Sequence, residues 1–542
     1  MICAALALDP DDPDTLNSLA DSYLGQGELQ QAIDYFRRVV ELCPASAEAY
    51  YRLGHVQEKN ADWETATDSY RRALALRPDS PQYHCNLARV LRQRGTLEEA
   101  VMFLQRAAAL DPNRYETYNQ LGLVLTDLGQ FGAALETLRH ALALRPDSAG
   151  TVHSLGYFFE RKGDLPSAVD SYRCALKLDP KMLVAHLQLG IVRLKLGDPT
   201  EALECFQRAR ALDPNSAEVT FNLGLIHLLQ GNLSLGWSEY ESRLRISDGL
   251  RNHRRFSQPQ WKGEPLEGTR ILLYAEQGLG DAMQFVRYVP LVTARGGQVV
   301  LEVLPRLRRL LSRTEGAWQV ITCGETAPEF SYQCPLLSLP LAMGTELSTI
   351  PAKVPYIYPD PAQVDTWRQR LQKDVLRVGL AWAGSPKHSR DSWRSIPLAQ
   401  LAPLLNIPGT TFCSLQMGPG AEQVKQMGPN TRLIDLQDEQ EDFADTAAIV
   451  ANLDLVISVD TSVAHLTGAM GKPLWVILSN APDWRWFLER EDSPWYPTAR
   501  LFRQSTHGSW RDVVDRLERA LRQLVASTRV GGRTGPVERG DA

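Results

Sequence analysis

The stretch "ASAEAYYRLGHVQEKNADWETATDSYRRALALRP", residues 45–78, decides the first half of the fold. It holds two segments with apolar residues at helical spacing, a polar turn between them, and a closing proline that cannot continue a helix. Proline returns every 34 residues, at positions 10, 44, 78, 112, 146, 180 and 214. Each 34-residue unit is therefore predicted to contain two amphipathic helices.

Small residues mark two positions in every unit, where we expect the two helices to cross closely. The first set is Ala20, Gly54, Ala88, Gly122, Gly156, Gly190 and Gly224, and the second is Ala32, Ala66, Ala100, Ala134, Ala168, Ala202 and Gly236. These units resemble the tetratricopeptide repeat, and the match predicts an α solenoid of about seven repeats over residues 1–248. The seventh unit ends in "GWSEYESRLRISD" instead of proline, as a terminal unit that docks against another part would.

A polar residue precedes the leucine of the first helix in every repeat. The set is Ser18, Arg52, Asn86, Gln120, Ser154, Gln188 and Asn222. Stacked along a solenoid, these side chains would line the concave face and hydrogen-bond the backbone of an extended peptide. The pattern is similar to the asparagine ladder of the O-GlcNAc transferase family, which also joins such repeats to a sugar-transferring domain. A solvated helix face is the alternative interpretation.

Composition excludes several classes of partner. The chain has 542 residues, a net charge of −6 and 23% charged residues, which give no basic field for nucleic acid. No apolar run is long enough for a membrane span. The start "MICAALALDPDD" does not read as a secretory signal, and the eight cysteines are scattered without a CxxC pair. We therefore expect a cytoplasmic protein with no nucleic-acid partner and no membrane span.

After Asp248 the repeat pattern stops. Residues 249–268, "GLRNHRRFSQPQWKGEPLEG", read as a basic, solvated linker. Short apolar runs then alternate with helical stretches: "RILLYA", "GQVVLEV", "WQVITC", "LRVGLAWA", "TTFCSL", "RLIDL", "LDLVISV" and "PLWVIL". This alternation predicts parallel sheets covered by helices, in two doubly wound Rossmann-like α/β domains over 269–355 and 356–526 with a cleft between them. Residues 527–542 are predicted to be disordered.

Ligands bind beyond the carboxyl ends of the strands in such folds, so the loops there carry the functional prediction. The first loop is "YAEQGLGDAMQFVRY", in which Gly278 and Gly280 let the backbone approach a ligand and Asp281 opens a helix. A helix cap is the ordinary role for Asp281. A dinucleotide site with Glu302 on the ribose is a further alternative, but Met283 replaces the third glycine of that fingerprint.

The second loop is "GLAWAGSPKHSRDSWRSIPL", residues 379–398. A turn at Ser385 presents Lys387, His388, Arg390 and Arg394. Cations in this position would stabilise the charge that grows on a departing diphosphate. A solvated loop of mixed charge is the alternative.

The third loop is "SVDTSVAHLTGAMGKP", residues 458–473. Hydroxyls of Thr461 and Ser462 and the positive end of the following helix would together make an anion site. His465 lies about one turn further in, where it could reach a phosphate or a ribose, or could simply belong to the core. Asp460 could cap the helix or hold the loop.

Aromatic residues follow in "APDWRWFLEREDSPWY", residues 481–496. Trp484, Trp486, Trp495 and Tyr496 could stack on a base or sugar, or could fill the floor of the cleft.

Together "GLGDAMQFVRY", "WAGSPKHSRDSWRSIPL" and "SVDTSVAHLTGAMGKP", followed by "APDWRW", resemble the motifs of the heptosyltransferase-like glycosyltransferases, family nine, in a form fused to tetratricopeptide repeats. The likeness covers about residues 1–525. It implies the two-domain GT-B fold, an inverting reaction, and no metal or other cofactor. It implies that Asp281 is the catalytic base and that Lys387 meets the donor diphosphate. The expected donor site comprises Gly278, Gly280, Ser385, Lys387, Asp460, Thr461, Ser462 and His465.

The sequence thus predicts an enzyme that moves a sugar from a nucleotide sugar to a protein or peptide held by the repeats. A carboxylate base and cations on the leaving diphosphate suit an inverting displacement without a metal. Two alternatives stay open: an inactive scaffold whose repeats mediate protein–protein interaction, and a transferase to a glycan or lipid-linked acceptor.

Overall fold

The structure is a computed structural model that describes residues 11–246, 256–371, 375–386, 391–427 and 432–531. It divides into two compact units, residues 1–192 and 193–542. The division lies inside the repeats and not at residue 248, where the sequence predicts the solenoid to end. The final repeat therefore belongs to the same compact unit as the α/β part.

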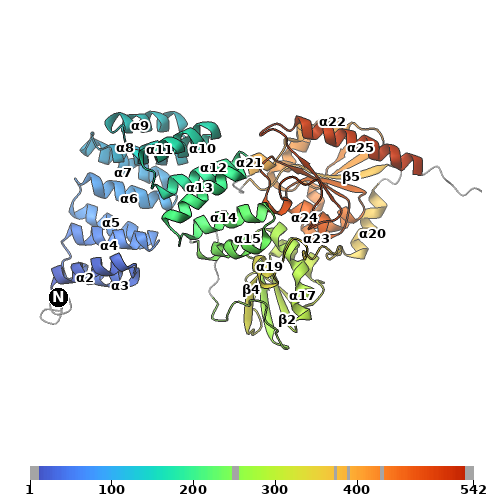
Figure 1. Cartoon of the computed structure of the whole chain (residues 1–542), viewed down its shortest axis with the longest axis horizontal. Coiled ribbons are helices and arrows are strands. Elements are labelled where there is room, and N and C mark those ends of the chain that lie inside the picture. Colours follow the sequence, from blue (N-terminus) through green and yellow to red (C-terminus); the bar gives the residue numbers. More distant parts are fainter. Residues whose placement is uncertain (1–10, 247–255, 372–374, 387–390, 428–431, 532–542) are drawn as a thin grey trace, which may run out of the picture. The chain divides into compact units, whose positions relative to one another are not determined.

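Within residues 11–246 the repeats form seven successive helix pairs, and Figure 1 shows the pairs of the first unit stacked side by side. The helices are α2 (Pro13–Gln26), α3 (Leu29–Leu42), α4 (Ala47–Lys59), α5 (Trp63–Leu76), α6 (Pro81–Gln93), α7 (Leu97–Leu110), α8 (Tyr115–Asp127), α9 (Phe131–Leu144), α10 (Ala149–Lys162), α11 (Leu165–Leu178), α12 (Leu183–Lys195), α13 (Pro199–Leu212), α14 (Ala217–Leu229) and α15 (Leu233–Tyr240). The predicted helical solenoid is confirmed.

Close packing inside each pair explains the small residues of the repeat. A Cβ atom added to Gly54 would lie 3.0 Å from the Tyr70 ring, and one added to Gly156 would lie 2.5 Å from the Tyr172 ring. Both distances are shorter than ordinary contacts between carbon atoms, so the predicted close crossing is confirmed at these positions.

A four-stranded parallel sheet follows the repeats. Its strands are β1 (Arg270–Tyr274), β2 (Gln298–Val303), β3 (Ala317–Thr322) and β4 (Tyr332–Pro335), in the order β3-β2-β1-β4. Its helices are α16 (Leu279–Phe285), α17 (Val289–Ala294), α18 (Arg308–Leu311) and α19 (Leu339–Ala342). Three of these strands were predicted from apolar runs, whereas β4 was missed.

A second, six-stranded parallel sheet completes the α/β part. Its strands are β5 (Leu376–Ala381), β6 (Thr410–Ser414), β7 (Leu433–Ile434), β8 (Leu455–Val459), β9 (Leu474–Leu478) and β10 (Ala499–Arg503). Their order, β10-β9-β8-β5-β6-β7, is that of a doubly wound nucleotide-binding sheet, with its switch point between β5 and β8. Its helices are α20 (Pro361–Arg370), α21 (Asp391–Arg394), α22 (Ala402–Leu405), α23 (Phe443–Ala451), α24 (Ser462–Ala469) and α25 (Arg511–Gly531).

Helices cover both faces of the second sheet, with α22 and α25 on one side and α23 and α24 on the other (Figure 1). Leu380 and Ile457 pack in the core that includes α22 and α25, whereas Ala381 and Val456 pack in the core that includes α23 and α24. Both faces need apolar side chains, which is why these strands read as continuous apolar runs.

One hydrophobic core joins the last repeat to both sheets. Trp237 of α15 packs in the same cluster as Ile271 of β1 and Val476 of β9. The docking expected of the seventh unit is therefore confirmed, and the indole Nε1–H of Trp237 donates to the Thr345 carbonyl at 3.1 Å.

Two predicted boundaries change. Residues 256–268 of the expected solvated linker pack against the α/β part, because Trp261 and Leu266 are each 1% exposed; residues 249–255 lie outside the described part of the chain. Helix α25 extends to Gly531, so disorder from residue 527 is wrong for its first residues. The sequence offers no glycine or proline there before Gly531 to stop the helix. The rest of that tail also lies outside the described residues.

Candidate functional site

A cleft of about 830 Å³ lies at the carboxyl ends of the strands of the second sheet. Loops after β5, β6, β8 and β9 line one side, the loop after β1 lines another, and helices α14 and α15 of the last repeat contribute a third. The switch point between β5 and β8 therefore opens into this cleft, as expected for a nucleotide-binding sheet.

The loop after β8 forms the first polar wall of the cleft. Thr461 stands before α24 in extended conformation and makes no side-chain cap hydrogen bond. Its hydroxyl lies 3.1 Å from Ser458 Oγ, which donates to the Val459 carbonyl at 2.7 Å. Thr461 and Ser462 both line the cleft. A helix that begins here, uncapped by a side chain, presents backbone N–H groups on which an anion could bind.

His465 lines the same cleft, but most of its ring is buried. The residue is 6% exposed, Nδ1 lies 2.9 Å from the Tyr496 hydroxyl, and the ring stacks on Trp486 at 5.6 Å. Burial, followed by the nearby Arg485 guanidinium, lowers the pKa of His465 to about 3. His465 is therefore a neutral imidazole that presents little charge to a phosphate. Its partners, Trp486 and Tyr496, come from the 481–496 segment. The sequence around His465 gives no sign of these contacts.

Gly280 explains how His465 is packed from the other side. A Cβ atom added to Gly280 would lie 2.7 Å from Cδ2 of His465. The glycine in "GLGD" therefore allows α16 of the first sheet to approach α24 of the second.

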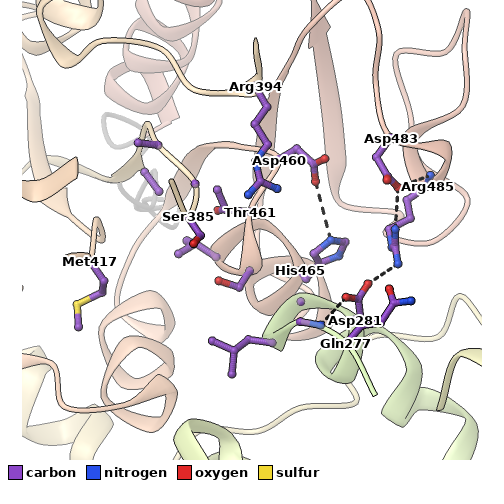
Figure 2. A pocket seen from close by; sticks show the side chains of 18 of the residues that line it. Gln277, Asp281, Ser385, Arg394, Met417, Asp460, Thr461, His465, Asp483 and Arg485 are labelled. Carbon is purple, nitrogen blue, oxygen red and sulfur yellow. Dashed lines mark hydrogen bonds and ion pairs between the residues drawn. The ribbon is translucent and has the colours of Figure 1, made fainter. Parts of the chain in front are cut away.

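Asp460 faces His465 across the start of α24, with Oδ1 at 4.0 Å from Nε2 (Figure 2). Burial raises the pKa of the Asp460 carboxyl and the Asp483 carboxylate raises it further, while Arg394 opposes the change. The carboxylate lines the cleft as predicted, among cations from two other loops.

The loop after β5 brings Ser385 and Arg394 to the cleft (Figure 2). Arg394 is partly buried, with Nε 3.4 Å from Asp391 Oδ1. A Cβ atom on Gly384 would lie 2.4 Å from Nη2 of Arg394, so the glycine lets the guanidinium lie against the backbone. The three other cations predicted here, Lys387, His388 and Arg390, lie outside the described residues.

Gln416, which the sequence analysis missed, fixes this loop. Its Oε1 accepts from the backbone N–H groups of Trp382 and Ala383 at 3.1 and 2.8 Å, and its Nε2 donates to the Ala383 carbonyl at 3.0 Å. The end of β5 is thereby tied to the loop after β6. A glutamine after a strand gives no sequence signal of this kind.

Asp281 lies in the cleft at the start of α16. Its Oδ2 accepts from the Gly278 N–H at 2.9 Å, which confirms the capping role. Its Oδ1 accepts from Nη2 of Arg485 in a short ion pair (Figure 2). The carboxylate therefore combines a cap with a second contact that comes from the other sheet.

Arg485 was part of a quoted motif but received no predicted role. Its Nη1 donates to Asp483 at 2.8 Å and its Nε donates to Gln284 at 2.7 Å, while the guanidinium lies 4.2 Å from the Trp484 ring. Burial would lower the pKa of Arg485, but Asp483 and Asp281 raise it above its usual value. A charged guanidinium thus links Asp281 and Gln284 of α16 to the loop after β9.

The aromatic residues of 481–496 form the floor of the cleft. Trp484, Trp486, Trp495 and Tyr496 are each at most 3% exposed, and Trp484 is the member that lines the cleft. Their arrangement agrees with core packing, and the Trp484 ring that borders the cleft is already covered by the Arg485 guanidinium.

The dinucleotide alternative gains no support from Glu302. This residue is 1% exposed within β2, so its carboxylate does not present itself to a ribose. Among the described residues, no group of three or more His, Cys, Asp or Glu side chains is placed to hold a metal ion.

The predicted peptide ladder is largely occupied by local contacts. Ser18, Ser154 and Asn222 each donate to a carbonyl four residues earlier in their own helix. Arg52 pairs with Glu48 and Asp21, and the Asn86 amide donates to the Tyr51 hydroxyl at 2.9 Å. Gln120 has a buried Oε1 without a hydrogen-bond partner, and Gln188 is half-buried. These contacts therefore do not leave a uniform row of free polar side chains along the repeats.

Comparison with known families identifies the repeats. Residues 3–211 match the model of the cilia and flagella-associated protein 70 C-terminal domain, and residues 187–248 match a tetratricopeptide-repeat model. The N-terminal part of the chain is therefore a tetratricopeptide-repeat solenoid, the class of helical array that commonly supports protein–protein interaction.

Among curated proteins, Protein FlbA of Caulobacter vibrioides is 31% identical over 323 residues, which cover 55% of this chain and 54% of FlbA. The chain thus spans about half the length of this relative, whose name states no activity. Among solved structures, yeast Tom70 is 17% identical with a TM-score of 0.39, covering 46% of this chain and 54% of Tom70. A tetratricopeptide-repeat protein of Parabacteroides merdae is 15% identical with a TM-score of 0.37, covering 44% of this chain and 94% of its own.

Within the described part of the chain, every helix is too short or too polar to cross a membrane.

Proposed function

We propose that this chain is an inverting, metal-independent glycosyltransferase of the GT-B type that moves a sugar from a nucleotide sugar to a protein or peptide acceptor. The observation that carries the proposal is the position of Asp281. It projects from the first sheet into a cleft that also opens at the switch point of the second sheet. A donor bound at the switch point would place its sugar toward this carboxylate.

The part of the cleft at the start of α24, where we place the donor, offers groups suited to bind a diphosphate. Thr461 and Ser462 stand at the start of α24, and Arg394, the last residue of α21, lines the same cleft. A helix N-terminus together with a guanidinium is a suitable environment for the negative charge of a nucleoside diphosphate. Lys387, two residues after Ser385 in the sequence and outside the described residues, is proposed as a second cation for the same group.

The proposed reaction uses Asp281 on one side of the cleft and the start of α24 with Arg394 on the other. Asp281 accepts the proton of an acceptor hydroxyl while the hydroxyl oxygen attacks the anomeric carbon of the sugar. The bond from that carbon to the diphosphate oxygen breaks, and its electron pair leaves with the nucleoside diphosphate. The hydroxyl attacks from the face opposite the departing diphosphate, so the configuration at the anomeric carbon inverts. Arg394 and the start of α24 stabilise the charge on the diphosphate, so the reaction requires no metal.

A second candidate function rests on the ion pair between Asp281 and Arg485. Both oxygens of this carboxylate are already engaged, one by Arg485 and the other by the Gly278 N–H, which leaves less room for an acceptor hydroxyl and favours a scaffold that binds a nucleotide sugar without turnover. In that case the repeats would recruit partner proteins and the cleft would be a sensor of the nucleotide.

Turnover and binding separate these candidates. With a donor that shifts the unfolding temperature, we expect the full chain to release nucleoside diphosphate and Asp281→Ala to release none while still binding the donor. Full activity in Asp281→Ala would eliminate the base assignment. Donor binding without product release in the natural chain would favour the scaffold.

A further inference from the structure

The last repeat supplies one wall of the cleft itself. Phe221 and Leu225, one turn apart on α14, and Tyr240 at the end of α15 all line it beside Gln277 and Asp281. Phe221 and Leu225 are half-buried, so part of each apolar side chain faces the cleft. Deletion of the repeats would therefore remove one wall of the cleft as well as the surface proposed to bind partner proteins.

This wall is held firmly against both sheets. The Phe221 and Tyr240 rings lie 5.4 Å apart, and the Gln277 amide donates to the Tyr240 hydroxyl at 3.4 Å. Trp237 meets the Trp484 ring edge-on at 5.1 Å. Such packing around a shared core keeps the wall in a fixed position relative to Asp281.

A buried ion pair secures the same junction. Arg243, which follows α15 and is 1% exposed, bonds the Glu276 carboxylate at 2.8 Å and the Ser338 hydroxyl at 2.7 Å. Both partners belong to the first α/β half, next to the loop that carries Asp281. The repeat and the candidate base are therefore parts of one structural block.

The chemistry of the wall selects between acceptor classes. A glycan carries hydroxyl groups around the rim of each sugar ring, and each hydroxyl that loses water needs a hydrogen-bond partner. Phe221 and Leu225 offer none. A peptide can place a serine or threonine hydroxyl at Asp281 and an apolar neighbouring side chain against this wall.

We propose that the acceptor is a peptide segment in which a serine or threonine is flanked by an apolar residue that packs on Phe221 and Leu225. This inference rests on the proposed transferase function and specifies its acceptor. The wall is the specificity element, and Asp281 receives the hydroxyl that the wall positions.

Two matched peptide pools test the proposal with the full-length chain. Both carry a central serine or threonine, flanked by leucine and valine in one pool and by asparagine and glycine in the other. With a nucleotide sugar that binds the natural chain, we expect labelling of the apolar pool to exceed the polar pool by roughly 10-fold or more, because burying an apolar group in a matching pocket supplies about that discrimination.

Variants then assign the preference to the wall. Phe221→Ala combined with Leu225→Ala should bring the ratio of the two pools close to one, while Phe221→Leu, which keeps an apolar side chain, should retain the preference. Leu235→Ala removes a leucine that is 43% exposed on the same repeat and serves as the matched control, with an unchanged ratio.

The outcomes that overturn the inference are distinct from failure of the proposed function. Three outcomes would contradict the proposed acceptor while leaving the transferase proposal intact. They are equal labelling of the two pools, a preference that survives the double variant, and transfer to an oligosaccharide probe but to neither pool. If the natural chain neither binds nor cleaves any of the UDP-, GDP- and ADP-linked sugars, the transferase proposal fails and this inference fails with it.

Discussion

Arg485 bonds Asp281 across the cleft, so the candidate base on one sheet is held by a guanidinium that belongs to the other. The same guanidinium bonds Asp483 and Gln284. We infer that Arg485 sets the position of Asp281 and also contributes to the cohesion of the two α/β halves.

Loss of this guanidinium should be costly. Arg485→Gln leaves Asp281 and Asp483 without their buried cation, and breaking such a pair destabilises proteins by about 3–5 kcal/mol. We expect a correspondingly lower free energy of unfolding in urea. Arg490→Gln is the control, because Arg490 pairs with Asp492 at an exposed site, where a pair contributes about 1 kcal/mol or less. Equal effects of the two substitutions would contradict a structural role for the buried network.

Gly280 allows the contact between α16 and α24. Gly280→Ala would place a methyl carbon 2.7 Å from the His465 ring, whereas Gly278→Ala meets Asp281 Oδ2 at 3.2 Å. Overpacking of this kind costs about 1–3 kcal/mol. We expect Gly280→Ala to lower the unfolding temperature clearly more than Gly278→Ala does, as measured by calorimetry. The reverse order would show that the two helices do not meet as described.

The buried His465 should make stability depend on pH. Its pKa of about 3 in the folded chain lies below the ordinary value of 6.5, so the unfolded chain binds the proton more readily. Stability is lost as pH falls from about 6.5 toward 3, with a slope of roughly 1.4 kcal/mol per pH unit at most. Asp460, whose pKa is raised by burial, acts in the opposite sense.

A substitution separates these two groups. His465→Gln retains Asp460, so the difference between natural and variant unfolding free energies from pH 7 to pH 5 should isolate the histidine. We expect a shallower acid loss in the variant. Parallel curves would mean that His465 is already accessible to protons in the folded state.

Within the solenoid, two glycines of α10 offer a matched pair. Gly156→Ala would bring a methyl carbon to 2.5 Å from the Tyr172 ring, while the nearest atom to a methyl at position 150 is Ser148 Oγ at 3.9 Å. We expect Gly156→Ala to destabilise by about 1–3 kcal/mol. Gly150→Ala should be neutral or stabilising by up to about 1 kcal/mol, since alanine is the better helix former. Helical circular dichroism during thermal unfolding measures both.

The regular parts of the fold could be predicted because their patterns are local. The 34-residue spacing and the apolar runs such as "LDLVISV" located the helix pairs and most strands. Strands β4 and β10, each at one edge of its sheet, were missed because their apolar pattern is weak. "YQCP" ends in proline, and "ARLFR" interrupts its apolar residues with arginine. Edge strands need only partial burial, so they carry a weaker signal.

The candidate site could be predicted only as far as its loops. The segments around Asp281, Ser385 and Thr461 do meet at one cleft. Contacts between distant segments decided the rest: His465 is buried against Tyr496 and approached by Gly280, and Arg485 reaches α16. No spacing within a single motif encodes such contacts. The wall formed by the last repeat was missed for the same reason.

The most direct test of the account is ligand-dependent unfolding of the full chain against nucleoside diphosphates and their sugars, without added metal. A ligand that binds the folded state alone raises the midpoint, by an amount set by its concentration relative to its Kd. The account predicts a shift with one nucleoside diphosphate and its sugars, and a smaller shift in Arg394→Gln. The absence of a shift with every compound would contradict the assignment of this cleft as a nucleotide-sugar site.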